Sequence, residues 1–207
     1  MADQAVRPSS ATDPKGGATA RWRTVDIVVT AVLGVAFGVV FWAWNQAFGP
    51  LSAPQAFLAP QVGILNGVYQ IPGVVAGLLV RKPGAAVFAS TLAAAVSLLF
   101  GSPYGGIIIV YGLVQGVGGE LGFLLTRYRS FGWGTAVLAG VTAGLSTSIL
   151  DNSLYYSDLS FLGFKLPYTV FTVISSVLLA GIVGLLLVRA MARTGALSSF
   201  AAGRSRV

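Results

Sequence analysis

Residues 25–48 read VDIVVTAVLGVAFGVVFWAWNQAF, an almost uninterrupted apolar run. An α-helix rises about 1.5 Å per residue, so roughly 20 apolar residues cross the hydrocarbon core of a bilayer. A secretory signal would carry a shorter apolar stretch followed by a small-residue cleavage site. The run continues past that length, and it therefore predicts a retained transmembrane helix.

Five further stretches have the length, or nearly the length, of a membrane helix, although residues 84–100 are short. They cover residues 61–80, 84–100, 105–125, 132–150 and 167–188. Turn-forming residues separate the helices, with the first connection placed near Pro50, Pro54 and Pro60. The sequence predicts an all-α integral membrane protein, a bundle of six transmembrane helices.

The composition excludes several classes of function. Of 207 residues, 55% are hydrophobic and 9% are charged, whereas a soluble domain carries about 25% charged residues. The net charge of +7 comes from small clusters between apolar runs, so we expect no nucleic-acid partner. Cysteine and histidine are absent, which removes thiol nucleophiles, imidazole bases and zinc sites. Without a nucleotide-binding Gly-Lys-Ser or Gly-Lys-Thr loop either, the chain is predicted to be no enzyme, with no catalytic residues, metal or cofactor.

The basic residues set the predicted orientation. If the N-terminus is cytoplasmic, six crossings leave Lys165 outside and twelve cations inside, as the positive-inside rule describes. Those twelve are Arg7, Lys15, Arg21, Arg23, Arg81, Lys82, Arg127, Arg129, Arg189, Arg193, Arg204 and Arg206. We therefore expect a multi-pass plasma membrane protein with both ends in the cytoplasm. We expect residues 1–22 to form a disordered cytoplasmic tail, residues 23–190 the transmembrane substrate-binding domain and residues 191–207 a basic cytoplasmic tail.

Glu120 lies within a predicted membrane helix. A charge at the bilayer centre costs roughly 2.5–3.5 kcal/mol on insertion scales, so it needs a partner or a purpose. One interpretation is a ligand contact or a coupling element. The other is a structural ion pair with Arg81, Lys82 or Arg127. The sequence leaves both open.

Aromatic and amide side chains gather toward the predicted outer surface. An interfacial aromatic belt explains some of the rings but not amides at membrane depth. Rings beside amides suit a flat heterocycle, so we predict an outer binding pocket. Asp151 and Asp158 make its mouth acidic, although solvated loop acids are the commoner interpretation. The predicted substrate-binding residues are Trp42, Asn45, Asn66, Tyr69, Gln70, Tyr111, Gln115, Glu120, Asn152 and Tyr155.

Small residues recur every four positions on the first helix, at Thr30, Gly34 and Gly38. Such a stripe lets helices approach closely, within one bundle or against another subunit. We expect it, with Ala31, to be the docking face for a membrane partner.

Two motifs carry a family resemblance: RKPGAA at residues 81–86, and QGVGGE at 115–120 followed by Phe123 and RYR at 127–129. Together they resemble the YkoE family, substrate-binding subunits of energy-coupling factor (ECF) transporters, over about residues 23–190. The resemblance implies a six-helix S component that captures thiamine or its hydroxymethylpyrimidine precursor from outside. It also implies a transmembrane coupling subunit and two cytoplasmic ATPases as partners.

The chain departs from the family pattern in two places. In S components, helix one often meets the coupling subunit through an Ala-x-x-x-Ala pattern, but Ala31 is followed here by Val35. The Gly34–Gly38 stripe is expected to replace it. Ser90 stands where relatives tend to carry an acid, which puts any role of that position in doubt.

A self-sufficient small-solute carrier or channel is the alternative function. Inverted repeats with broken mid-membrane helices would favour it. Only Pro72 marks a candidate interruption, and the second half of the chain has no matching break.

Overall fold

The structure is a computed structural model that describes residues 21–52 and 60–194, and its regular elements there are all helical. A 3-10 helix, η2, leads into α2, and two π-helical segments, η3 and η4, are continuous with α6 and α7. The elements are α1 (Thr24–Ser52), η2 (Gln61–Asn66), α2 (Gly67–Val80), α3 (Ala85–Leu99), α4 (Ile107–Leu125), α5 (Trp133–Leu154), η3 (Phe161–Lys165), α6 (Leu166–Ser176), η4 (Val177–Val183) and α7 (Gly184–Arg193).

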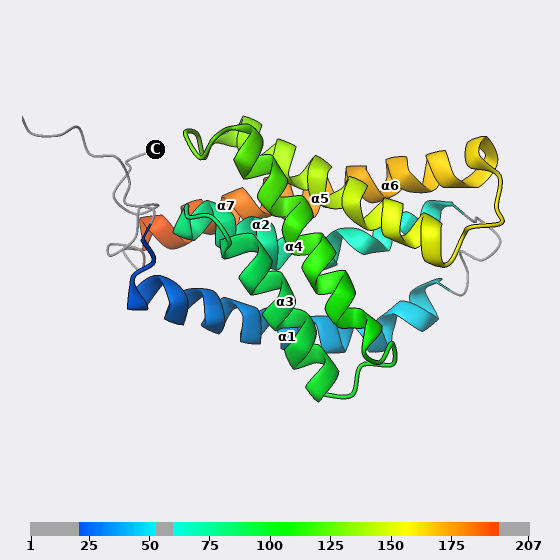
Figure 1. Ribbon diagram of the computed structural model, residues 1–207, viewed down its shortest axis with the longest axis horizontal. Coiled ribbons are helices and arrows are strands. Elements are labelled where there is room, and N and C mark those ends of the chain that lie inside the picture. Colours follow the sequence, from blue (N-terminus) through cyan, green and yellow to red (C-terminus); the bar gives the residue numbers. More distant parts are fainter. Residues whose placement is uncertain (1–20, 53–59, 195–207) are drawn as a thin grey trace, which may run out of the picture.

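These elements form six continuous helical rods, which confirms the predicted bundle. Five are long and apolar enough to cross a membrane, and α3 is the shorter sixth. The start of α1 and the end of α7 lie at the same end of the bundle (Figure 1), as an even number of crossings requires. We call this the Arg81 end, because the α2–α3 turn lies there too, and the opposite one the Asp151 end. Which end faces the cytoplasm stays a prediction.

Several boundaries differ from those predicted, two of them around the loops at the Asp151 end. The first connection was expected near Pro50, but α1 continues through it to Ser52. Proline lacks an N–H and so removes one helical hydrogen bond, here two residues before the helix ends. The last rod begins at Phe161, before the expected residue 167, because π-helical turns join directly onto α6. The predicted tails lie outside the described residues except for residues 21, 22 and 191–194.

Helix α2 is the centre of the bundle, and every residue from Pro72 to Val80 is buried. Gly77 lets α4 approach it, since a Cβ at that position would lie 2.2 Å from the Phe123 ring. Valines on the far side of α1, such as Val32 and Val39, are exposed, as expected of a surface that faces lipid.

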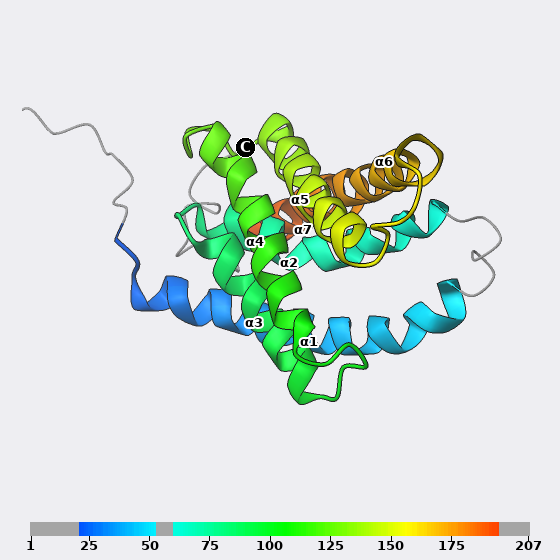
Figure 2. The ribbon, with the colours of Figure 1, turned by 45° about the vertical axis from the view of Figure 1, so that its right-hand side comes forward.

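The small-residue stripe of α1 packs against α3 of the same chain, which lies across it in Figure 2. Thr30, Gly34 and Gly38 are buried, and a Cβ at Gly38 would lie 2.5 Å from Val96. This corrects the predicted docking face: close approach does occur there, but within the bundle. Only Ala31 of that set is half-buried.

Polar contacts fasten α1 to the α2–α3 turn at the Arg81 end. Asp26, 1% exposed, accepts hydrogen bonds from Lys82 Nζ at 2.6 Å and from the Arg23 guanidinium at 3.3 Å. The indole of Trp22 donates to the Pro83 carbonyl at 3.1 Å. Trp22 thus belongs to the fold, although the sequence placed it in the tail.

Candidate functional site

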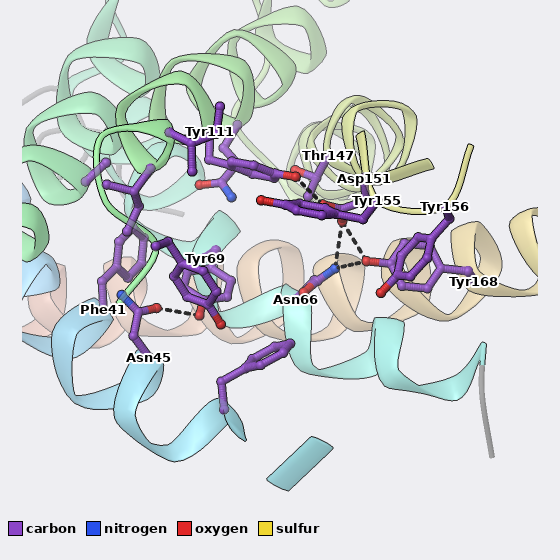
Figure 3. Close-up of a pocket in the computed structure, with 16 residues that line it drawn as sticks. Phe41, Asn45, Asn66, Tyr69, Tyr111, Thr147, Asp151, Tyr155, Tyr156 and Tyr168 are labelled. Carbon is purple, nitrogen blue, oxygen red and sulfur yellow. Dashed lines mark hydrogen bonds between the residues drawn. The ribbon is translucent and has the colours of Figure 1, made fainter. Parts of the chain in front are cut away.

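A cavity of about 250 Å³ lies at the Asp151 end (Figure 3). Eight of its sixteen lining residues are aromatic, and one is acidic. The lining residues are Phe41, Asn45, Phe48, Asn66, Tyr69, Ala94, Tyr104, Ile107, Ile108, Tyr111, Gln115, Thr147, Asp151, Tyr155, Tyr156 and Tyr168. Walls of aromatic faces with a few polar groups are typical of sites for small organic ligands.

Asp151 is the polar centre of the cavity wall, and its side chain is buried. Its Oδ1 lies 2.6 Å from the Tyr111 hydroxyl, and its Oδ2 lies 2.6 Å from the Tyr168 hydroxyl and 3.1 Å from Asn66 Nδ2. Asn66 also donates to Tyr168 at 2.7 Å. These four residues come from α4, α5, α6 and the end of η2, so the cluster holds four rods together.

A second polar cluster fixes the opposite wall. Asn45 Nδ2 donates to Ser97 Oγ and Ser102 Oγ, each at 3.1 Å, and the Tyr69 hydroxyl donates to Asn45 Oδ1 at 2.6 Å. The cluster joins α1, α2, α3 and the α3–α4 turn. It holds the Tyr69 ring against Phe41, with the ring centroids 5.2 Å apart.

Helical spacing explains why these side chains share one cavity. Residues four apart on a helix lie on the same face. Tyr111 and Gln115 are four apart on α4, as are Thr147 and Asp151 on α5. α4 and α5 therefore each direct two polar or aromatic side chains into the cavity.

Gln115 is the one amide lining the cavity that has no hydrogen-bond partner among the described residues. Its side chain lines the cavity but is only 5% exposed, and within the described part of the chain it makes no hydrogen bond. An amide offers two donors and one acceptor. Within the described residues, both donors and the acceptor of Gln115 are therefore free.

The tyrosine hydroxyls near the mouth keep their protons at neutral pH. Burial, and then the nearby charge of Asp151, raises the pKa of Tyr156 above its ordinary value. Burial also raises the pKa of Tyr104. Both side chains therefore act as hydrogen-bonding aromatic groups and carry no charge.

Six of the predicted binding residues line the cavity: Asn45, Asn66, Tyr69, Tyr111, Gln115 and Tyr155. Three others lie close but face elsewhere. Gln70 donates to Thr147 Oγ1 from behind the wall at 2.7 Å, Asn152 donates to Thr169 Oγ1 at 3.2 Å, and Trp42 packs against Phe100. Each of the three shares a helix or a turn with a lining residue but points from a different face.

Glu120 lies outside the cavity, at the Arg81 end. Its carboxylate accepts hydrogen bonds from the backbone N–H groups of Gly84, at 2.8 Å, and Ala86, at 3.0 Å, and from the Tyr128 hydroxyl. Glu120 therefore does not contact the cavity, which corrects the predicted ligand contact. Its partners are backbone N–H groups at the start of α3. Among the described residues it makes no ion pair, so the alternative interpretation is not observed either. An acid at a helix N-terminus satisfies unpaired N–H groups, which accounts for a carboxylate at this depth.

The sequence missed the central role of Asp151. With the fifth helix expected to end at residue 150, Asp151 fell into the connection and its solvated interpretation was favoured. The structure extends α5 to Leu154 and buries Asp151, whereas Asp158 is exposed. The four-residue spacing from Thr147 is the signal that would have placed it on the cavity face.

Comparisons with known proteins agree with this architecture. Residues 25–146 match the family model described as the permease component of an ABC-type cobalt transport system. The chain is 32% identical, over 88% of its length and 91% of the relative, to YkoE of Bacillus subtilis (strain 168), named as an HMP/thiamine permease protein. The chain belongs to the YkoE family.

A solved structure, described as the crystal structure of an S-component of ECF transporter, matches this fold with a TM-score of 0.83. It is 33% identical, and the match covers 89% of this chain and 92% of that one. This YkoE-family protein is therefore an ECF transporter S component: a transporter subunit rather than an enzyme, and a multi-pass protein of the plasma membrane. The resemblance drawn from RKPGAA and QGVGGE is confirmed.

Proposed function

We propose that this S component captures thiamine or its hydroxymethylpyrimidine precursor from outside the cell. The observation that carries the proposal is the cavity at the Asp151 end, where eight aromatic rings surround a free amide and one carboxylate. Thiamine and its precursor share a flat aminopyrimidine ring. Aromatic faces stack on such a ring, while an amide oxygen accepts a hydrogen bond from its exocyclic amine.

The site chemistry assigns roles to particular side chains. Tyr111 and Tyr155 lie nearly parallel, with their ring centroids 6.4 Å apart, and they offer a stacking surface beside Asp151 (Figure 3). Gln115 reaches the cavity from the same helix as Tyr111 and would bind the polar edge of the pyrimidine. The relative from Bacillus subtilis is named for the same pair of compounds, which supports this substrate class.

Transport needs partners in this proposal. The sequence contains no nucleotide-binding loop ending in Gly-Lys-Ser or Gly-Lys-Thr. A transmembrane coupling subunit and two cytoplasmic ATPases would therefore supply the energy. The cation distribution supports placing the Arg81 end in the cytoplasm, which turns the cavity toward the outside.

Equilibrium binding to the purified full chain tests the substrate. We expect thiamine, hydroxymethylpyrimidine or both to bind far more tightly than millimolar by titration calorimetry. Millimolar or weaker binding of both compounds would overturn the proposal.

Flux through proteoliposomes tests the mode of transport. We expect uptake of radiolabelled substrate only when a coupling subunit and ATPases are present with ATP. Uptake by liposomes that contain this chain alone would establish a self-sufficient carrier instead.

A further inference from the structure

The carboxylate of Asp151 lies in the cavity wall, and both of its oxygens accept hydrogen bonds from neighbouring side chains. Asn66 Nδ2 donates to Asp151 Oδ2 at 3.1 Å and to Tyr168 Oη at 2.7 Å. The Tyr168 hydroxyl accepts from Asn66, so its own hydrogen points to Asp151 Oδ2. Two donors therefore meet Oδ2, which leaves no place for a proton on that oxygen.

The second oxygen also accepts a hydrogen bond. The Tyr111 hydroxyl donates to Asp151 Oδ1 at 2.6 Å. The arrangement therefore fits an ionised Asp151 that accepts three hydrogen bonds.

No cation of the chain balances this charge within the described residues. The sixteen lining residues include no lysine and no arginine, and the ion pairs seen in the structure both involve Asp26 at the other end of the bundle. A buried carboxylate loses hydration, and hydrogen bonds from neutral donors replace only part of it. Within the described residues, the negative charge of an ionised Asp151 thus has no cationic side chain to balance it.

The surroundings of Asp151 favour an organic cation as the group that supplies this charge. Tyr111, Tyr155, Tyr156 and Tyr168 bring aromatic faces or edges around the carboxylate, and ring faces attract cations. No group of three or more acidic residues that could hold a metal ion is present in the described ranges.

We propose that Asp151 is the counter-ion of the bound ligand, and that it makes the cavity select an organic cation over a neutral molecule of the same shape. This inference rests on the proposed function and sharpens it. Of the two candidate substrates, thiamine carries a permanent positive charge on its thiazolium ring, whereas hydroxymethylpyrimidine is neutral at neutral pH. The charged ring lies beside Asp151, and the aminopyrimidine extends toward Gln115.

The test compares thiamine with an uncharged analogue in which a thiophene ring replaces the thiazolium. Titration calorimetry on the full chain, at one pH and one salt concentration, gives the two dissociation constants. We expect thiamine to bind at least about tenfold more tightly than the analogue. Equal affinities would overturn the inference while leaving the proposed function intact. Failure of thiamine, hydroxymethylpyrimidine and the analogue to bind would overturn both.

Two variants locate the charge. In Asp151→Asn we expect the preference for thiamine over the analogue to fall to about threefold or less, because the neutral amide keeps the shape but not the charge. Asp158→Asn is the matched control, since Asp158 is exposed and does not line the cavity. This variant should prefer thiamine over the analogue by the same factor as the wild type. An unchanged preference in Asp151→Asn would overturn the assignment. The wild-type comparison decides the charge selectivity even if Asp151→Asn does not fold.

Discussion

The Glu120 carboxylate on α4 accepts the backbone N–H of Gly84 at 2.8 Å, and this contact ties the QGVGGE motif to the RKPGAA motif. The second carboxylate oxygen accepts a hydrogen bond from the N–H of Ala86 at 3.0 Å. The Tyr128 hydroxyl donates to the first oxygen, which also accepts from Gly84. The two motifs that revealed the family are therefore in direct contact. They form the junction between the α2–α3 turn, the start of α3 and the α4–α5 turn.

Glu120→Gln should destabilise the fold and leave the affinity for the ligand unchanged. Glutamine keeps one acceptor oxygen for three donors, so we expect a loss of about 1–3 kcal/mol in the free energy of unfolding. The dissociation constant for thiamine should stay within about twofold, a change below 0.5 kcal/mol. Thermal unfolding in detergent and calorimetric binding measure the two effects. Weaker binding at unchanged stability would contradict this structural role.

Asp26 and Lys82 should be coupled energetically. Both side chains are largely buried, and breaking a buried ion pair by removing one partner costs about 3–5 kcal/mol. We expect Asp26→Asn and Lys82→Gln each to lower the unfolding temperature. The double variant should lose less than the sum of the single losses. Additive losses would show that the two residues act independently.

Gly38→Ala should destabilise the isolated chain. The added methyl would lie 2.5 Å from Val96 Cβ and 3.0 Å from the Ala93 carbonyl oxygen, so α1 and α3 must separate. We expect a loss of about 1–3 kcal/mol, as for other overpacked cores. Gly49→Ala is the control, because nothing lies within 4 Å of its added Cβ.

The same pair of variants distinguishes internal packing from docking. If the stripe on α1 met a partner instead of α3, Gly38→Ala would leave the thermal unfolding of the purified chain unchanged. It would then lower only the fraction of the chain that co-purifies with a coupling subunit.

Gln115→Leu should weaken binding without unfolding the protein. The amide makes no hydrogen bond to the described part of the chain, so its removal leaves no protein group unpaired. A lost hydrogen bond to ligand corresponds to about 0.5–1.5 kcal/mol, or roughly two- to tenfold in the dissociation constant. Gln46→Leu on the exposed face of α1 is the matched control and should bind as the wild type does. Equal affinities in the two variants would remove Gln115 from the site.

The cavity shows how far local sequence reasoning reached. Asn66, Tyr111 and Gln115 do line the cavity, and their role in binding stays a prediction. They could be singled out because a polar group at membrane depth needs a partner or a function. Gln70 was placed in the cavity for the same reason, as an amide at membrane depth. Its side chain instead reaches Thr147 behind the wall. Which face of a helix meets the cavity depends on the rotation of that helix in the bundle, and composition does not encode it directly.

The sequence by itself determined the membrane class, the six rods and the family. Hydropathy and helix rise are properties of each segment alone, and motifs keep their spacing in the printed chain. Only the tertiary structure decided that Glu120 caps α3, that the stripe of Thr30, Gly34 and Gly38 packs inside the bundle, and that Asp151 is the centre of the cavity. Each of these features depends on which surfaces of helices distant in the sequence pack together. That packing decides which hydrogen-bonding groups lie close to a buried polar side chain.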